Sequence, residues 1–227
     1  MPENHLIELL PRADRVRLRA ICEPVQHELS EILYEPGKLT RHVYFPIDAF
    51  ISLVTSVPGH PGLEVGMVGS EGMVGVHLAL GVETAPLHAL VQGAGAGMRI
   101  AAKPFRAELA RSAPLQRVLQ RYAYVLMSQL ATSAACLRYH EIESRLARWL
   151  LMTQDRAHAE QFHVTHEFLA YMLGVRRAGI TSAAAGMKRN RLITYHRGAL
   201  TVLDREGLER AACSCYSADR KSYDDSL

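Results

Sequence analysis

The fold of this chain is decided by the stretch THEFLAYMLGVRRAGITSAAAGMKRNRLI, residues 165–193 of its 227. Thr165 can cap a helix that begins at His166, because its hydroxyl accepts a hydrogen bond from a free N–H group of the first turn. Gly174 provides a turn, since glycine adopts a positive φ without strain. Residues able to hold two short helices together flank this turn: Leu169, Ala170, Leu173, Val175, Ile180 and Ala183. The pattern predicts a helix-turn-helix whose second helix starts near Arg176.

The charges around this motif have one sign. No Asp or Glu occurs between Glu167 and Asp204. Acidic side chains would oppose an approach to phosphates, so their absence favours a nucleic-acid partner. The candidates for reading bases from the second helix are Arg176, Arg177, Thr181 and Ser182. The candidates for phosphate contacts are Thr165, Lys188, Arg189, Arg191 and Arg197.

A hairpin is expected next, because residues 192–203 form two short apolar runs around Arg197 and Gly198. This would be a wing with a basic tip beside the DNA backbone. The motif and wing together predict sequence-specific binding of double-stranded DNA. The alternative is a plain helical hairpin in a module that binds only proteins, and a strong salt dependence of DNA affinity would separate the two.

The N-terminal half has a different composition. Residues 42–98 contain no Lys or Arg, and short apolar runs such as 50–54 and 63–69 are punctuated by Gly and Pro. This pattern is typical of an antiparallel β-sandwich or roll. Residues 3–22 before it are expected to be helical.

A long helix is predicted after Pro114, which a first helical turn tolerates. No Gly or Pro follows from 115 to 173, and apolar residues recur at spacings of three and four. We expect this stripe to form a dimer interface through Leu115, Leu119, Tyr122, Leu126, Leu130 and Leu137. The alternative is that the stripe packs on the β-domain. A second helix is expected over 142–153, a polar connection over 154–163, and a loosely ordered polar tail over 217–227.

These features resemble the Crp/Fnr family of bacterial transcription regulators along almost the whole chain. The similar segments are Tyr34-Glu35-Pro36-Gly37, Tyr44-Phe45-Pro46, Gly69-Ser70-Glu71-Gly72-Met73-Val74-Gly75, the long helix and residues 164–193. The resemblance implies an α+β fold: a cyclic-nucleotide-binding-like, jelly-roll-like β-roll (1–113), a dimerisation helix (114–140), a winged helix-turn-helix (141–216) and a tail (217–227). It also implies a homodimer that binds a palindromic operator and acts on RNA polymerase.

The chain departs from the members that bind cyclic nucleotides. Those members use a Glu for the ribose and an Arg for the phosphate, whereas Val76 and His77 follow Gly75 here and residues 81–90 contain no Arg. A buried phosphate needs a charged partner. We therefore expect a degenerate effector domain that does not bind cyclic AMP, and the effector is unknown. In the second helix Ala178 and Ser182 replace residues of the best-known members, so a different operator is expected.

The four cysteines are Cys22, Cys136, Cys213 and Cys215. Family members with an iron–sulfur cluster need four ligands, and the N-terminal region offers only Cys22. Haem-binding members use His or an N-terminal Pro as axial ligands, and the candidates here are Pro2, His5 and His77. Single residues of these types do not predict a haem. Cys213 and Cys215 could belong to a metal or redox site that signals through cysteines, or be incidental thiols. We expect the second, with no metal and no cofactor.

Several function classes are disfavoured by the sequence. A net charge of +3 and a composition of 48% hydrophobic residues are ordinary for a globular protein. We find no signal peptide, no membrane-spanning run and no catalytic motif. The chain is therefore expected to be a cytoplasmic protein with no membrane partner, no catalytic residues and no enzymatic activity.

Overall fold

A computed structural model describes residues 3–60, 62–196 and 198–227, and these fall into two compact units. Unit 1 takes its described residues from 1–53, 66–127 and 223–227, and unit 2 takes them from 54–65 and 128–222. The division falls inside helix α4 (Ala113–Tyr139), whereas the sequence suggested boundaries before and after that helix. The domain boundaries given above stay a prediction.

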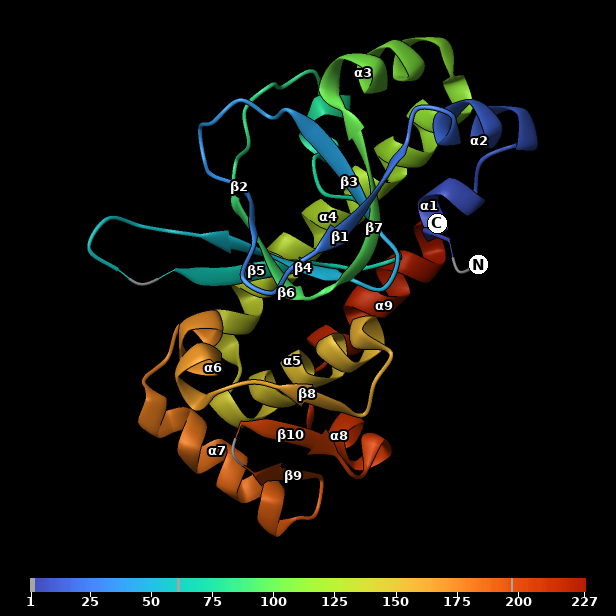
Figure 1. Ribbon diagram of the computed structural model, residues 1–227. Coiled ribbons are helices and arrows are strands. Elements are labelled where there is room, and N and C mark those ends of the chain that lie inside the picture. Colours follow the sequence, from blue (N-terminus) through green and yellow to red (C-terminus); the bar gives the residue numbers. More distant parts are fainter. Residues whose placement is uncertain (1–2, 61, 197) are drawn as a thin grey trace. The chain divides into compact units, whose positions relative to one another are not determined.

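Unit 1 is built on two antiparallel sheets (Figure 1). The first has the order β1 (Glu23–His27), β7 (Gly95–Ala101), β3 (His42–Pro46). The second has the order β2 (Ile32–Tyr34), β6 (His88–Gly93), β4 (Phe50–Thr55), β5 (Leu63–Val68). A short 3₁₀ helix, η1 (Val76–Leu80), lies between β5 and β6. The β-roll predicted from the Gly- and Pro-punctuated apolar runs is confirmed.

The main core of unit 1 joins the first sheet to helices. Alternate side chains of the paired strands β3 and β7, among them Val43, Phe45 and Ile100, are fully buried. They cluster with Leu6, Leu18 and other residues from α1 (His5–Glu8), α2 (Arg12–Arg19), α3 (Ala102–Arg111) and α4. The helical structure expected over residues 3–22 is confirmed as two short helices, and Pro11, whose ring fixes φ, sits at the N-cap of α2 and separates them.

Helix α4 is confirmed as a long helix, but its apolar stripe points inward. Ser112 starts it by accepting a hydrogen bond from the Leu115 N–H at 3.2 Å. Leu115, Leu119 and Tyr122 are buried in the core of unit 1, and the Tyr122 hydroxyl donates to the Met73 carbonyl at 3.0 Å. These three side chains are therefore unavailable to a second chain, which corrects the expected interface. Three others of that set are half-buried: Leu126, Leu130 and Leu137.

Unit 2 contains helices around one small antiparallel sheet (Figure 1). Its elements after α4 are α5 (Ile142–Ala157), β8 (Gln161–His163), α6 (His166–Leu173), α7 (Arg177–Arg189), β9 (Ile193–His196), β10 (Ala199–Val202), α8 (Arg205–Ala211) and the part of α9 (Cys215–Ser226) up to residue 222. The helix expected to end at Thr153 continues to Ala157, and β8 replaces part of the expected connection. Among the residues that the structure describes, no helix is long and apolar enough to cross a membrane.

The C-terminal tail is a helix, α9, not a loose segment. Tyr216 and Asp219 on this helix are buried. The Asp219 carboxylate pairs with the Arg148 guanidinium at 2.6 Å, and the Tyr216 hydroxyl donates to the Asp155 carboxylate at 2.9 Å. The inward-facing polar side chains of α9 therefore bond to charged groups of α5. Composition alone does not reveal this role.

Candidate nucleic-acid interface

Helix α6 begins and ends where the sequence predicts. The Thr165 hydroxyl accepts a hydrogen bond from the Phe168 N–H at 3.1 Å, which caps the first turn. Gly174 ends the helix with φ 61°, a left-handed conformation that favours glycine. Leu63, from the tip of the β4–β5 hairpin that belongs to unit 2, lies against this glycine, so a Cβ there would clash with its side chain. The turn is thus fixed by conformation and by packing.

Helix α7 begins at Arg177, one residue after the expected start, and Arg176 provides no side-chain cap. Glycine within this helix costs stability relative to alanine, and the structure gives the reason for it. A Cβ at Gly179 would stand 2.8 Å from the Ile142 side chain of α5. The two helices cross closely at this point, with Ile180 and Met187 buried beneath. The opposite face of α7 is therefore left to solvent.

The candidate base-reading residues lie on this exposed face. Arg177, Thr181 and Ser182 are all exposed on α7, and Arg176 is exposed just before it. The candidate phosphate contacts are exposed as well, at Thr165, Lys188, Arg189 and Arg191. Arg197 lies outside the described residues. An exposed, acid-free helix face with arginine in its first turn has the chemistry to enter a DNA groove.

A hairpin follows α7, as expected for a wing. Strands β9 and β10 pair antiparallel, with Tyr195 opposite Leu200 and His196 opposite Ala199. Strand β8 adds to the other edge of β10, a third strand that the sequence did not predict. Strand β10 is therefore the centre of a three-stranded sheet, with β9 at one edge and β8 at the other.

His166 is a site residue that sequence reasoning missed. Its Nδ1 lies 3.1 Å from the Thr181 hydroxyl, and its ring stacks on Tyr195 at a centroid distance of 4.7 Å. Burial, followed by the nearby charge of Arg177, lowers the pKa of this imidazole. His166 thus connects α6 to α7 and to the wing. No local pattern signals this role, because the three partners meet only in the fold.

Comparisons with known proteins agree with this geometry. Residues 144–211 match the Crp-like helix-turn-helix domain. The chain carries a Crp-like helix-turn-helix domain. Comparison with curated proteins gave no match.

Solved structures extend the likeness to most of the chain. A regulator of the Crp/Fnr family from Eubacterium rectale is 15% identical with a TM-score of 0.71, covering 91% of this chain and 97% of that one. FixK2 from Bradyrhizobium japonicum is 11% identical with a TM-score of 0.72, covering 85% and 98%. A CRP family regulator from Thermus thermophilus is 21% identical with a TM-score of 0.69, covering 83% and 96%. The chain has the Crp/Fnr fold, as the resemblance drawn from its sequence predicted.

Two buried arginines support the Crp-like domain from α5. The Arg145 guanidinium donates to the Leu173 carbonyl, at the end of α6 beside the turn. Arg148 bonds to Asp219 at 2.6 Å and to the Ser133 hydroxyl at 3.3 Å. Sequence reasoning missed both, since arginines on an apolar helix are recognised as structural only when their partners are known.

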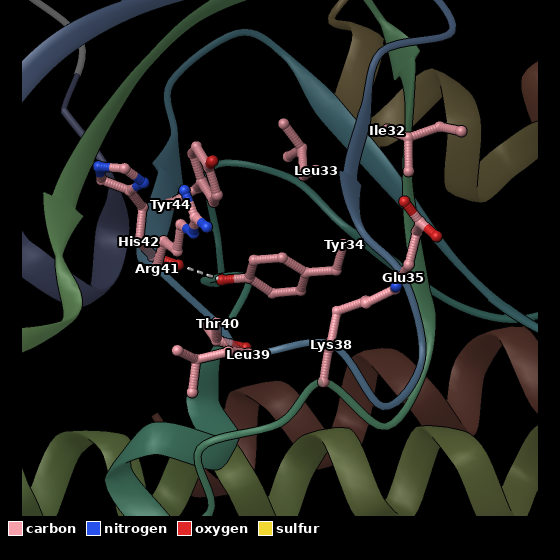
Figure 2. A pocket seen from close by; sticks show the side chains of 11 residues that line it. Ile32, Leu33, Tyr34, Glu35, Lys38, Leu39, Thr40, Arg41, His42 and Tyr44 are labelled. Carbon is pink, nitrogen blue, oxygen red and sulfur yellow. Dashed lines mark hydrogen bonds between the residues drawn. The ribbon is translucent and has the colours of Figure 1, made fainter.

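A second candidate site of this Crp/Fnr fold is a cavity of about 220 Å³ in unit 1. Tyr34 lies across it and donates to the His42 carbonyl at 2.5 Å, while Glu35, Lys38 and Arg41 line its walls (Figure 2). The lining therefore offers charges of both signs around an aromatic ring.

The η1 segment follows Gly75, where the resemblance implied the ribose-binding acid, and it buries its own side chains. Val76, His77 and Leu78 are buried. The Nε2 atom of His77 lies 2.7 Å from the Thr40 hydroxyl, and burial lowers the pKa of its imidazole. A neutral, hydrogen-bonded histidine thus stands near the place of the expected ribose-binding acid.

Proposed function

We propose that this chain is a sequence-specific, DNA-binding transcription regulator that acts as a homodimer on a palindromic operator. One observation carries the proposal. The outward face of α7 presents Arg177, Thr181 and Ser182 to solvent, in a segment without an acid between Glu167 and Asp204. Arginine in the first turn of such a helix can bond to the edge of a guanine, which is the commonest specific contact in the major groove.

The roles of the other residues follow from their places on the same surface. The Thr181 hydroxyl already takes part in hydrogen bonding within the protein. It donates to the Arg177 carbonyl at 3.1 Å and faces the His166 ring. We assign it to positioning the helix as well as to a DNA contact. Lys188 and Arg189, in the last turn of α7, would bind phosphates and supply affinity without sequence choice.

The proposed dimer uses a different face of α4 from the apolar stripe. Tyr124 and Met127 are 60% and 62% exposed, although both are large and apolar. Arg117, Gln120 and Arg121 lie exposed on the preceding turns of the same helix, with Gln120 and Arg121 three and four residues after Arg117. A second copy of the helix would cover these side chains. Two recognition helices could then enter major grooves about 34 Å apart.

We further propose that the β-roll does not bind cyclic AMP. The absence of arginine from residues 81–90 and the engagement of His77 by Thr40 support this. The cavity around Tyr34 is the place to look for another effector. Action on RNA polymerase at nearby promoters is the remaining part of the proposal, and it rests on the family resemblance.

The test is selection of bound duplexes from a random DNA pool, followed by anisotropy titrations of the selected duplex against salt. We expect an inverted repeat with half-sites about one helical turn apart and an affinity that falls steeply with salt. Arg177→Ala should cost about 1–3 kcal/mol and relax the choice at one base pair.

Arg210→Ala is the matched control for that variant, because Arg210 is an exposed arginine on α8, 71% exposed and outside the proposed surface. It should leave affinity unchanged. Equal weakening of specific and random DNA by Arg177→Ala would remove the base-reading role. Recovery of no consensus, with an affinity that ignores salt, would favour a module that binds only proteins.

A further inference from the structure

Four potential metal ligands meet in unit 2, and none of them belongs to the proposed DNA-contacting residues. They are Cys136, His140, Cys213 and Cys215, and their ligand atoms all lie within 4.8 Å of one another. The Sγ atoms of Cys136 and Cys213 are 3.5 Å apart, and the Sγ of Cys215 is 3.6 Å from the Nδ1 of His140. All four cysteines of the chain are free thiols.

The fold brings the four ligands together from two distant segments. Cys136 lies in the last turn of α4 and His140 directly follows that helix. The His140 N–H still donates to the Cys136 carbonyl at 3.1 Å, so this helical spacing places both side chains on the same side. Cys213 and Cys215 are two residues apart where α9 begins. The three cysteines are buried and form a cluster of their own, while His140 is half-buried. A set of ligands supplied in two short pairs is typical of structural zinc sites.

The observed separations suit one ion at the centre. Zn²⁺ binds sulfur at about 2.3 Å and nitrogen at about 2.0 Å, so tetrahedral ligand atoms stand about 3.5–3.8 Å apart. An iron–sulfur cluster places several atoms between opposite ligands, and so its ligands stand further apart than a single ion requires. A disulfide requires a sulfur separation of about 2.0 Å, much shorter than the 3.5 Å between Cys136 and Cys213.

Cysteine binds metal as the thiolate, so three cysteines bring negative charge into the site. Two positively charged side chains of α5, Arg145 and Arg148, are buried. Both lie close enough to Cys136 and Cys213 to interact with their charge. Three thiolates and a neutral histidine around a divalent ion leave one net negative charge, and these buried arginines can balance it.

We propose that Cys136, His140, Cys213 and Cys215 form a closed, tetrahedral site for a single thiophilic divalent cation, Zn²⁺. Sulfur and imidazole ligands select this class of ion over Mg²⁺ or Ca²⁺. Four protein ligands leave no open position, so the ion holds the structure together. It joins the start of α9 to the end of α4, segments 77 residues apart at Cys136 and Cys213.

The first experiment measures metal in the full chain, purified with a reductant and without chelator. We expect one zinc per chain by mass spectrometry. After removal of zinc, anaerobic titration with Co²⁺ should give thiolate-to-cobalt charge-transfer bands and the visible bands of a tetrahedral ion, saturating at one equivalent. Zn²⁺ should displace the cobalt and raise the melting temperature, because it binds only the folded chain tightly.

The variants locate the site. Cys213→Ser should weaken metal binding by more than the 10–100-fold that loss of a supporting hydrogen bond costs. His140→Ala keeps all three thiolates, so it should retain the charge-transfer bands and shift the visible ones. Cys22→Ser is the matched control, because Cys22 lies in unit 1, where its thiol donates to the Leu18 carbonyl at 3.3 Å. The Cys22→Ser variant should still bind one equivalent of Co²⁺.

The proposal is overturned by a full chain that carries no zinc and gives no cobalt charge-transfer band. It is also overturned if Cys22→Ser loses the ion as Cys213→Ser does. A disulfide between Cys136 and Cys213 in a metal-free chain under the same reducing conditions would identify a redox pair instead. The zinc content and cobalt spectrum of the unsubstituted chain test the proposal by themselves. The test therefore stays decisive even if one of the variants does not fold.

Discussion

Two helices of this chain, α4 and α7, were each expected from the sequence to present a surface to a partner. The apolar stripe of α4 is buried within its own chain, with Leu115, Leu119 and Tyr122 in the core of unit 1. The polar face of α7 is exposed, with Arg177 and Ser182 open to solvent. Apolar periodicity therefore identified a buried face without saying what buries it. Charge identified a solvent face directly, because unpaired arginines are costly to bury.

Truncation of a side chain in the buried stripe of α4 should have the greatest effect on stability. Leu119→Ala should lower the free energy of unfolding by about 2–5 kcal/mol, since Leu119 is fully buried and the change leaves a cavity. Urea unfolding monitored by circular dichroism measures the loss. Met127→Ala, on the exposed side of α4, should change it by less than about 0.5 kcal/mol at concentrations where the chain is monomeric. Similar losses in both variants would contradict the assignment of the two faces.

The next test asks whether the exposed side of α4 has a partner of its own. Tyr124→Arg should weaken self-association by about 10–100-fold, as expected when a charge replaces an aromatic residue central to an interface. Sedimentation equilibrium gives the dimer dissociation constant, and unchanged monomer stability provides the control. A dimer of undiminished affinity would place the interface elsewhere.

The polar face of α7 can be tested at its basic end. Lys188→Ala should weaken binding to specific and random DNA alike and reduce the slope of log affinity against log salt by about 1, because one phosphate contact is lost. Anisotropy titrations at several salt concentrations measure both quantities. A loss confined to one sequence would mean that Lys188 reads a base.

The smallest expected effect concerns pH. The pKa of His166 lies below its ordinary value of 6.5, so the unfolded chain binds a proton there more readily than the folded chain. The stability contributed at this site is therefore complete above pH 6.5 and decreases as the pH falls through that value. The groups that face the ring are Arg177, Thr181 and Tyr195.

His166→Gln should flatten the fall in melting temperature between neutral and mildly acidic pH. It should not abolish it, because His77 in unit 1 has a pKa lowered in the same direction and would still titrate. A profile as steep as that of the unsubstituted chain would show that His166 does not titrate on folding.

Much of the candidate DNA site could be read from local sequence. Thr165 caps α6 and Gly174 ends it, because capping and positive φ depend on residues within a few positions of one another. The exposed arginines of α7 follow from the spacing of its buried neighbours. The place of His166 could not be predicted, since Thr181 and Tyr195 reach it only after α6, α7 and the wing have packed.

The cysteines show where local reasoning stops. The pair Cys213 and Cys215 offers two ligands, too few for a structural metal site, and we therefore expected incidental thiols. The structure adds Cys136 and His140 from a helix more than seventy residues earlier. Likewise, the polar composition of the tail predicts a loose segment, whereas the ion pair between Asp219 and Arg148 holds it against α5.

The β-roll, the long helix, the helix-turn-helix and the sign of its charge follow from the amino-acid sequence alone, because periodicity, capping and turn residues act over a few positions. The buried face of α4, the histidine that connects the recognition helix to the wing, and the set of cysteines that meet are known only from the packed fold. These depend on contacts between residues far apart in the chain, whose positions are fixed by the packing of whole elements and not by any local pattern.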